Sequence, residues 1–246
     1  MLWYKSWLET RWRFLIGLGL LICSAWVMVF TYPQVLKLMP MISRDGGGEL
    51  GQRIREAAEL ARTFRGFVWS DWFHRNHSQL ATLFAILLGT ASLLRPSGGA
   101  LYLLSLPVSR QRLVAVRATT GLAELLVLAL LPALLIPILA PAIEQTYGAG
   151  AALVHGVCLF VVAAVFYNFA FLLSTIFSDP WRPPLIAGAA AIALSLTDRF
   201  IPFFRVMSAE SYFRRGALPW GGLLAAGAIA AALYYAAAAN LARRDV

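Results

Sequence analysis

The chain has 246 residues, of which 60% are hydrophobic and 13% charged, whereas about 25% of an average soluble domain is charged. This composition excludes a water-soluble domain, a disordered chain and a disulfide scaffold, because a protein of this size cannot hide so much apolar surface from water. The net charge of +9 fits an anionic cytoplasmic membrane surface. Basic runs interleaved with stacking aromatics are missing, so nucleic acid is not an expected partner. We therefore expect an integral membrane protein in contact with lipid.

Six apolar stretches are predicted to span the membrane as helices, since a crossing takes about 20 residues. The fifth stretch is short for a full crossing. The six stretches are residues 14–32, 79–94, 118–140, 151–175, 184–197 and 220–241. We therefore expect an all-α membrane protein, with residues 1–246 forming a single transmembrane domain.

An even number of spans places both termini on the same side of the membrane. The short segments on that side carry ten basic and three acidic residues, and the other side carries eleven basic and eight acidic residues. The larger positive excess, +7 against +3, predicts cytoplasmic termini. The expected location is the cell inner (plasma) membrane, with a multi-pass topology.

Residues 1–13 have the pattern of an amphipathic helix lying in the headgroup layer. Their aromatic and apolar residues occupy one half of the helical wheel, and most of their polar residues occupy the other. The apolar set is Trp3, Tyr4, Trp7, Leu8 and Trp12. The alternative is that these aromatics simply anchor the first span at the membrane surface.

Residues 33–78 are predicted to form a long external loop that contains an amphipathic helix. Apolar residues between Leu50 and Val68 follow the spacing of one helix face, and charged residues cover the opposite face. This helix packs either on the bilayer and neighbouring spans or against an external partner. Near the end of the loop, His74 and His77 have helical spacing, but further metal ligands are missing nearby, so we expect no metal site there.

Residues 96–117, between the second and third spans, are predicted to form a cytoplasmic helix-turn-helix. Ser109 is a suitable N-cap, with Val108 and Leu113 at the positions of a hydrophobic staple. Arg110 and Arg112 project from the first turn of the next helix, where the helix dipole disfavours cations. Either an acidic partner binds these arginines, or they only mark the cytoplasmic side.

Glu124 is an ionisable residue inside the third predicted span. A carboxylate at the centre of a membrane costs roughly 2.5–3.5 kcal/mol on insertion scales. We therefore expect a partner for it: Arg117 two turns earlier, a helix-end N–H or another subunit. The alternative is a position shallow enough for hydration.

Residues 198–219 interrupt the chain between the last two spans. The charged pair Asp198–Arg199 ends the fifth span, and a short apolar segment and a second basic pair follow. This pattern predicts re-entrant or half-inserted helices, which require protein or a cavity to cover their backbone.

The sequence contains neither a phosphate-binding Gly-x-x-x-x-Gly-Lys-Ser/Thr loop nor a nucleophile elbow. We therefore expect no enzyme activity, cofactor or metal in this chain itself.

The segment 104–110, Leu-Ser-Leu-Pro-Val-Ser-Arg, closely resembles the coupling-helix signature of type-2 ABC exporter permeases. Residues 3–15, 89–95 and 117–124 are also similar to members of that family. The resemblance covers most of residues 1–140. Beyond them, only the number of spans and the interrupted fifth span agree.

This resemblance implies a permease subunit that pairs with a second permease chain, as homodimer or heterodimer, and rests on cytosolic ABC ATPase subunits. ATP and Mg would be bound by the ATPase, and residues 1–13 would correspond to the family's connecting helix. The expected contacts with the ATPase lie in the coupling segment. They are Leu104, Leu106, Pro107, Val108, Ser109, Arg110 and Arg112.

The sequence departs from the family pattern just after the second span, because residues 95–100 lack the usual acidic residues. This departure suggests a heteromeric permease whose other chain keeps those carboxylates. The few polar residues in the spans favour an amphipathic or lipid-like cargo over a sugar or ion. The alternative function is a non-transporting polytopic membrane scaffold or assembly protein; a membrane enzyme is disfavoured because the spans lack a polar cluster.

Overall fold

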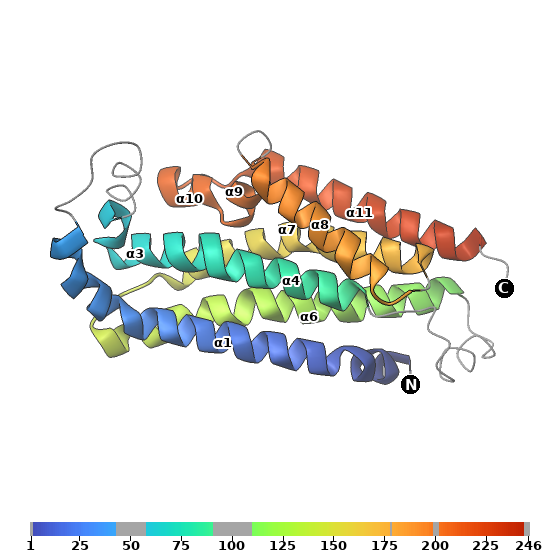
Figure 1. The fold of residues 1–246 in the computed structure, drawn as a ribbon, viewed down its shortest axis with the longest axis horizontal. Coiled ribbons are helices and arrows are strands. Elements are labelled where there is room, and N and C mark those ends of the chain that lie inside the picture. The colour runs from blue at the N-terminus through green and yellow to red at the C-terminus, as the bar shows by residue number, and fades with distance from the viewer. Residues whose placement is uncertain (1, 43–57, 91–109, 178, 199–201, 244–246) are drawn as a thin grey trace.

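The computed structural model describes residues 2–42, 58–90, 110–177, 179–198 and 202–243, and these residues are helical, with no β-strand among them. The long helices lie side by side as a bundle of alternating direction (Figure 1). The helices are α1 (Leu2–Ile42), α3 (Phe64–Phe67), the π-helix η1 (Val68–His77), α4 (Ser78–Gly89), α6 (Arg110–Leu139), the 3₁₀ helix η2 (Ala140–Ile143), α7 (Ala149–Ile176), α8 (Arg182–Leu196), α9 (Phe203–Met207), α10 (Glu210–Arg215) and α11 (Trp220–Arg243).

Four helices in the described part of the chain are long and apolar enough to cross a membrane: α1, α6 with η2, α7 and α11. They contain the first, third, fourth and sixth predicted spans. The second and fifth predicted spans correspond to shorter helices, α4 with 12 residues and α8 with 15. The described residues are thus compatible with a multi-pass membrane protein, and they show four of the six expected spans at full length.

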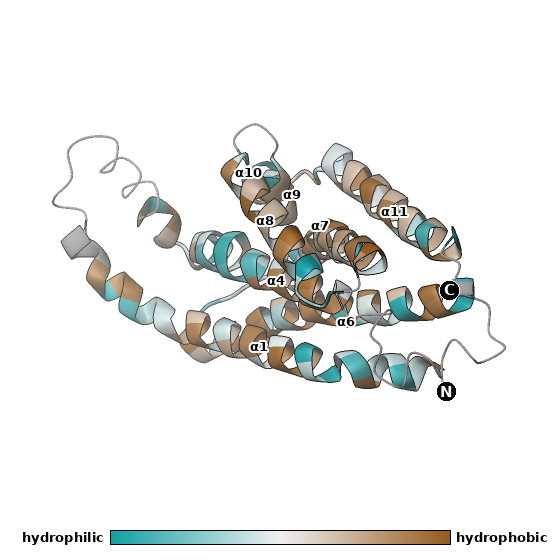
Figure 2. Ribbon diagram, turned by 45° about the vertical axis from the view of Figure 1, so that its right-hand side comes forward, coloured by the Kyte–Doolittle hydropathy of each residue, from teal (hydrophilic) through white to brown (hydrophobic). Residues whose placement is uncertain are grey.

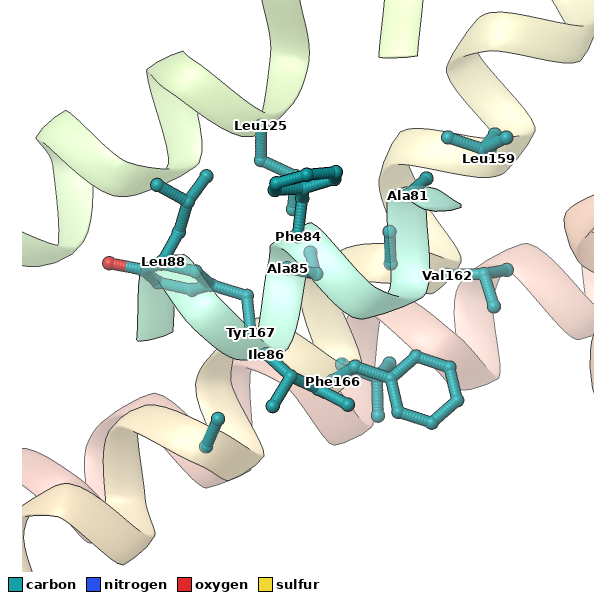
Figure 3. Close-up of a cluster of buried hydrophobic side chains, with 14 of the residues drawn as sticks. Ala81, Phe84, Ala85, Ile86, Leu88, Leu125, Leu159, Val162, Phe166 and Tyr167 are labelled. Carbon is teal, nitrogen blue, oxygen red and sulfur yellow. The ribbon is translucent and has the colours of Figure 1, made fainter. Parts of the chain in front are cut away.

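Helix α7 is the centre of the bundle. It packs against α4, α6 and α11, while α1 packs on α6 and α4. The core lies where these helices meet, and Figure 3 shows Phe84 of α4 beside Leu125 of α6 and Leu88 of α4 beside Tyr167 of α7. In Figure 2 the middle of α1 and most of α7 are hydrophobic, and hydrophilic residues gather in the first turns of α1.

Small residues allow the helices to approach α7 closely, as is usual between helices in membranes. A Cβ atom at Gly89 of α4 would overlap the backbone carbonyl of Tyr167, and one at Gly156 of α7 would come within 2.8 Å of the Leu130 side chain of α6. These two glycines therefore set how closely α7 lies against α4 and α6.

Helix α1 corrects two expectations. Residues 2–13 are helical, but they continue into the first span without a break, so a separate interfacial helix is absent from the described residues. The helix also continues through Pro33 to Ile42, ten residues beyond the expected end of the span. No proline lies between residues 2 and 32 to end the helix, and glycine and proline are both tolerated within membrane helices.

The expected external loop 33–78 is also mostly helical where it is described. Residues 68–77 form η1, which runs directly into α4, so the histidines expected in an interfacial loop lie on a helix. Residues 50–57 of the expected amphipathic helix lie outside the described residues, and Ala58–Ala61 are helical. The apolar and aromatic content of 68–77 explains the difference, because five of its side chains are buried.

The two ends of the bundle are formed by different elements. At the end that we call the terminal end, α1 and α6 begin and α4 and α11 finish (Figure 1). At the opposite end lie α9 and α10, two short helices within the segment expected to be re-entrant.

His77 provides a hydrogen-bond donor that Pro132 of α6 lacks. A proline has no backbone N–H, so Pro132 leaves the carbonyl of Leu128 in α6 without its helical donor. The Nε2 atom of His77 lies 3.2 Å from that carbonyl oxygen, and His77 is fully buried. Because a carbonyl only accepts, Nε2 carries the proton and donates. His77 therefore completes the helix that Pro132 interrupts.

A double-mutant cycle tests this pairing. His77→Ala leaves a buried carbonyl unsatisfied, and we expect the free energy of unfolding to fall by roughly 1–3 kcal/mol. In the Pro132→Ala background the new N–H of residue 132 bonds to Leu128, so the same histidine exchange should cost clearly less. Thermal unfolding in detergent measures both costs. Equal costs in the two backgrounds would contradict the pairing, since lost packing around the ring is common to both.

Candidate functional site

The predicted ATPase-contact segment is described only at its end. Leu104, Leu106, Pro107, Val108 and Ser109 lie outside the described residues. Arg110 is the first residue of α6, and Arg112 is exposed in its first turn. Both therefore lie at the terminal end, beside the start of α1 (Figure 1).

Glu124 is held by the first helix. The hydroxyl of Thr10 in α1 donates a hydrogen bond of 2.6 Å to Oε1 of Glu124 in α6. Both side chains are buried, with exposed fractions of 4% for Thr10 and 5% for Glu124. The expectation of a partner for Glu124 is thus met by a residue that sequence spacing did not indicate.

Arg117 does not form its ion pair with Glu124, which corrects the first partner that we expected. Its Nη1 atom lies 3.0 Å from Oε2 of Glu9 in α1, and the Arg117 side chain is buried while Glu9 is half-buried. Nη2 of Arg117 and Oε2 of Glu124 have no hydrogen-bond partner in the described part of the chain. Arg117 and Glu124 of α6 are therefore each bonded to α1 through one side-chain atom, and each has a second polar atom without a partner in the described residues.

Helix α7 contacts α6 at the same level as Arg117. The hydroxyl of Tyr167 donates to the backbone carbonyl of Arg117 over 3.3 Å. Gly121, one turn further along α6, makes room for the tyrosine ring, since a Cβ atom there would overlap it. We call Glu9, Thr10, Arg117, Glu124 and Tyr167 the polar cluster.

Helix α1 is also bonded to the end of α4. Arg13 Nη1 donates to the backbone carbonyl of Leu87 over 2.7 Å, and this carbonyl lies in the last turn of α4. A cation is favourable there because the helix dipole is negative at the C-terminus. Through Arg13 and the polar cluster, one helix contacts both α4 and α6, the two helices that flank residues 91–109.

At the opposite end, polar side chains converge on Ser208 between α9 and α10. The Trp69 indole N–H and Nδ1 of His155 lie 3.1 and 3.0 Å from the Ser208 carbonyl oxygen, and Nδ1 of His74 lies 3.2 Å from its hydroxyl. Sequence reasoning missed Ser208, because a serine in a short connection carries no distinctive signal.

The two histidines of the His-x-x-His spacing thus have different partners. His74 contacts Ser208, whereas His77 contacts Leu128 in α6. Within the described residues, no group of three or more His, Cys, Asp or Glu side chains is placed to hold a metal ion.

A groove of about 480 Å³ lies between α4 and α8, next to Ser208 and its partners. Its walls come from η1 and α4 on one side and from α8 and α9 on the other. The lining residues are His74, Arg75, Gln79, Thr82, Leu83, Ile86, Gly188, Ala191, Ile192, Ser195, Asp198 and Phe204. This groove could not be predicted from the sequence, because its two walls lie more than 100 positions apart in the chain.

Comparisons with protein-family models, with curated proteins and with solved structures find no match for this chain.

The contact between Thr10 and Glu124 can be tested with a matched control on the same helix. Thr10→Val removes the hydroxyl and leaves the Glu124 carboxylate short of a donor, so we expect the free energy of unfolding to fall by roughly 1–2 kcal/mol. Thr31→Val removes a hydroxyl that bonds only within α1, to the Val27 carbonyl at 2.7 Å, and should change it by less than about 0.5 kcal/mol. Thermal unfolding in detergent measures both; equal effects would contradict the assignment.

Proposed function

We propose that the chain is the transmembrane permease subunit of an ATP-driven type-2 ABC exporter. A separate cytosolic ATPase would hydrolyse ATP with Mg, and this chain would move the cargo across the cell inner membrane. The proposal starts from the resemblance of residues 104–110 to a coupling helix. The observation that carries it further is the attachment of α1 to both α4 and α6, the helices that lead into and out of that segment.

These contacts suggest how a push on the coupling segment would be transmitted. A displacement of residues 104–112 moves the end of α4 and the start of α6, because both are covalently joined to the segment. Arg13 holds α4 to α1, while Glu9 and Thr10 hold α6 to α1. The three helices would then shift together rather than slide past one another.

The remaining topology is part of the same proposal. We propose six crossings, with α4 continued by η1 and with α8 as the short fifth crossing, and with α9 and α10 as re-entrant helices. Both termini would be cytoplasmic, since the short segments on their side carry the larger positive excess, +7 against +3 on the other side.

A second permease chain would complete the transporter. Exposed small residues on α11, among them Gly221 and Ala225, suit close packing with another helix. We propose that the second chain is a different permease, because residues 95–100 lack the acidic residues expected there. A single permease species that purifies with full ATPase activity would contradict the heteromer and leave a homodimer.

Copurification tests the transport proposal directly. We expect the tagged chain, extracted from its native membrane in mild detergent, to carry a stoichiometric P-loop ATPase that mass spectrometry identifies. Leu106→Asp combined with Arg110→Glu should reduce the ATPase activity of the complex at least about tenfold, because one exchange removes apolar contact and the other reverses a charge. The melting temperature of the permease should stay unchanged.

The control makes the same two exchanges at the opposite end, Leu218→Asp with Arg215→Glu. This variant should keep its ATPase and its activity. If no ATPase copurifies even after trapping with ATP and crosslinking at residues 106–112, the coupling-helix assignment is wrong and the membrane scaffold becomes the better proposal.

A further inference from the structure

The groove between α4 and α8 has the size and position of a small-molecule site. Its volume of about 480 Å³ lies within the range of roughly 300–1,000 Å³ that is usual for ligand pockets. Small residues of α8 create the space: Ala191 lines the groove, and a Cβ atom at Gly188 would meet nothing within 4 Å. A larger residue at position 188 would therefore occupy the groove without disturbing the surrounding helices.

The groove is polar at one end and apolar at the other. Arg75 lies in η1, Gln79 lies in the first turn of α4, and Asp198 follows α8 and accepts a hydrogen bond from α9. Leu83 and Ile86 continue the groove along α4 for about 10 Å beyond Gln79. Such a division between a charged end and an apolar channel fits a molecule with a headgroup and a chain.

The two walls of the groove carry opposite charges, and each charge pairs with a residue on its own side rather than across the groove. In the described residues, Arg75 pairs with Asp71 of its own helix at 3.7 Å, and Asp198 pairs with Arg205 of α9 at the same distance. Asp198 also accepts the backbone N–H of Phe204 over 2.9 Å, which fixes its carboxylate at the rim. A cation and an anion thus face the groove from opposite sides.

We propose that this groove binds one phospholipid-type amphiphile with a zwitterionic headgroup. Its phosphate would lie at Arg75 and Gln79, its ammonium group at Asp198, and one acyl chain would run between Leu83 and Ile192. The proposal names the cargo class of the exporter and rests on the proposed function in that respect. Binding itself needs neither nucleotide nor ATPase, so a failure of binding and a failure of transport are distinguishable.

Photolabelling of the purified full chain in detergent tests the acyl channel. The probe is phosphatidylethanolamine with a diazirine at the middle of one acyl chain, and peptide mass spectrometry locates the labels. We expect saturable labelling of residues 83–86 and 188–192, at about one probe per chain. Gly188→Leu should reduce this labelling at least about fivefold, whereas Gly227→Leu, which adds the same side chain to open space on α11, should leave it unchanged.

A second pair of variants tests the headgroup. Arg75→Gln should weaken the preference for phosphatidylethanolamine over a neutral diacylglycerol carrying the same diazirine. Arg182→Gln removes an arginine that is equally exposed and also paired with a nearby aspartate, but lies outside the groove lining, and should not change the preference. The proposal is overturned if labelling in the groove does not exceed that of the exposed residues Leu224 and Ile229 of α11, or if Gly188→Leu does not reduce it.

Discussion

Inside a membrane, lipid offers neither a donor nor an acceptor, so every buried polar group of a spanning chain must find its partner within the protein. Most polar side chains in these helices meet this constraint locally. Thr82 and Thr119, for example, donate to carbonyls four residues earlier in their own helices. The exceptions are informative, because a polar group that reaches another helix also fixes how the two helices are placed.

Those long-range contacts gather at the two ends of the bundle. At the terminal end, Glu9, Thr10 and Arg13 hold α6 and α4 to α1. At the opposite end, the side chains of Trp69, His74 and His155 converge on Ser208 and hold the short helices α9 and α10 to the bundle. Between them the helices meet through apolar and small residues, as Figure 3 shows around Phe84 and Phe166. The ends are thus held mainly by specific bonds and the middle mainly by packing, with the bond from His77 to the Leu128 carbonyl as an exception.

Hydropathy was sufficient to locate the long helices, and it failed where helices continue beyond their apolar part. The stretches 14–32, 118–140, 151–175 and 220–241 all lie within helices of spanning length. The C-terminal end of α1 was missed because the predicted span ended at Pro33, and the whole of η1 was missed because its polar residues lower hydropathy without breaking backbone hydrogen bonds.

The candidate site could also be predicted only in part. The position of Glu124 inside a span predicted that it needs a partner, but no spacing rule connects it with Thr10, 114 positions away. The groove between α4 and α8 could not be predicted from the sequence either, since it depends on where α8 lies against α4. Pairings within one helix are predictable from sequence, and pairings between helices depend on packing.

The contacts between α1 and α6 also bear on how the chain enters the membrane during synthesis. Proteins emerge from the ribosome N-terminus first, so α1 is in place before Arg117 and Glu124 arrive. Both charged residues of α6 can then meet Glu9 and Thr10 as they insert, rather than face bare lipid at the cost that an unpaired charge carries. Because Glu9 and Thr10 precede Arg117 and Glu124 in the chain, they are already present when these two residues are synthesised.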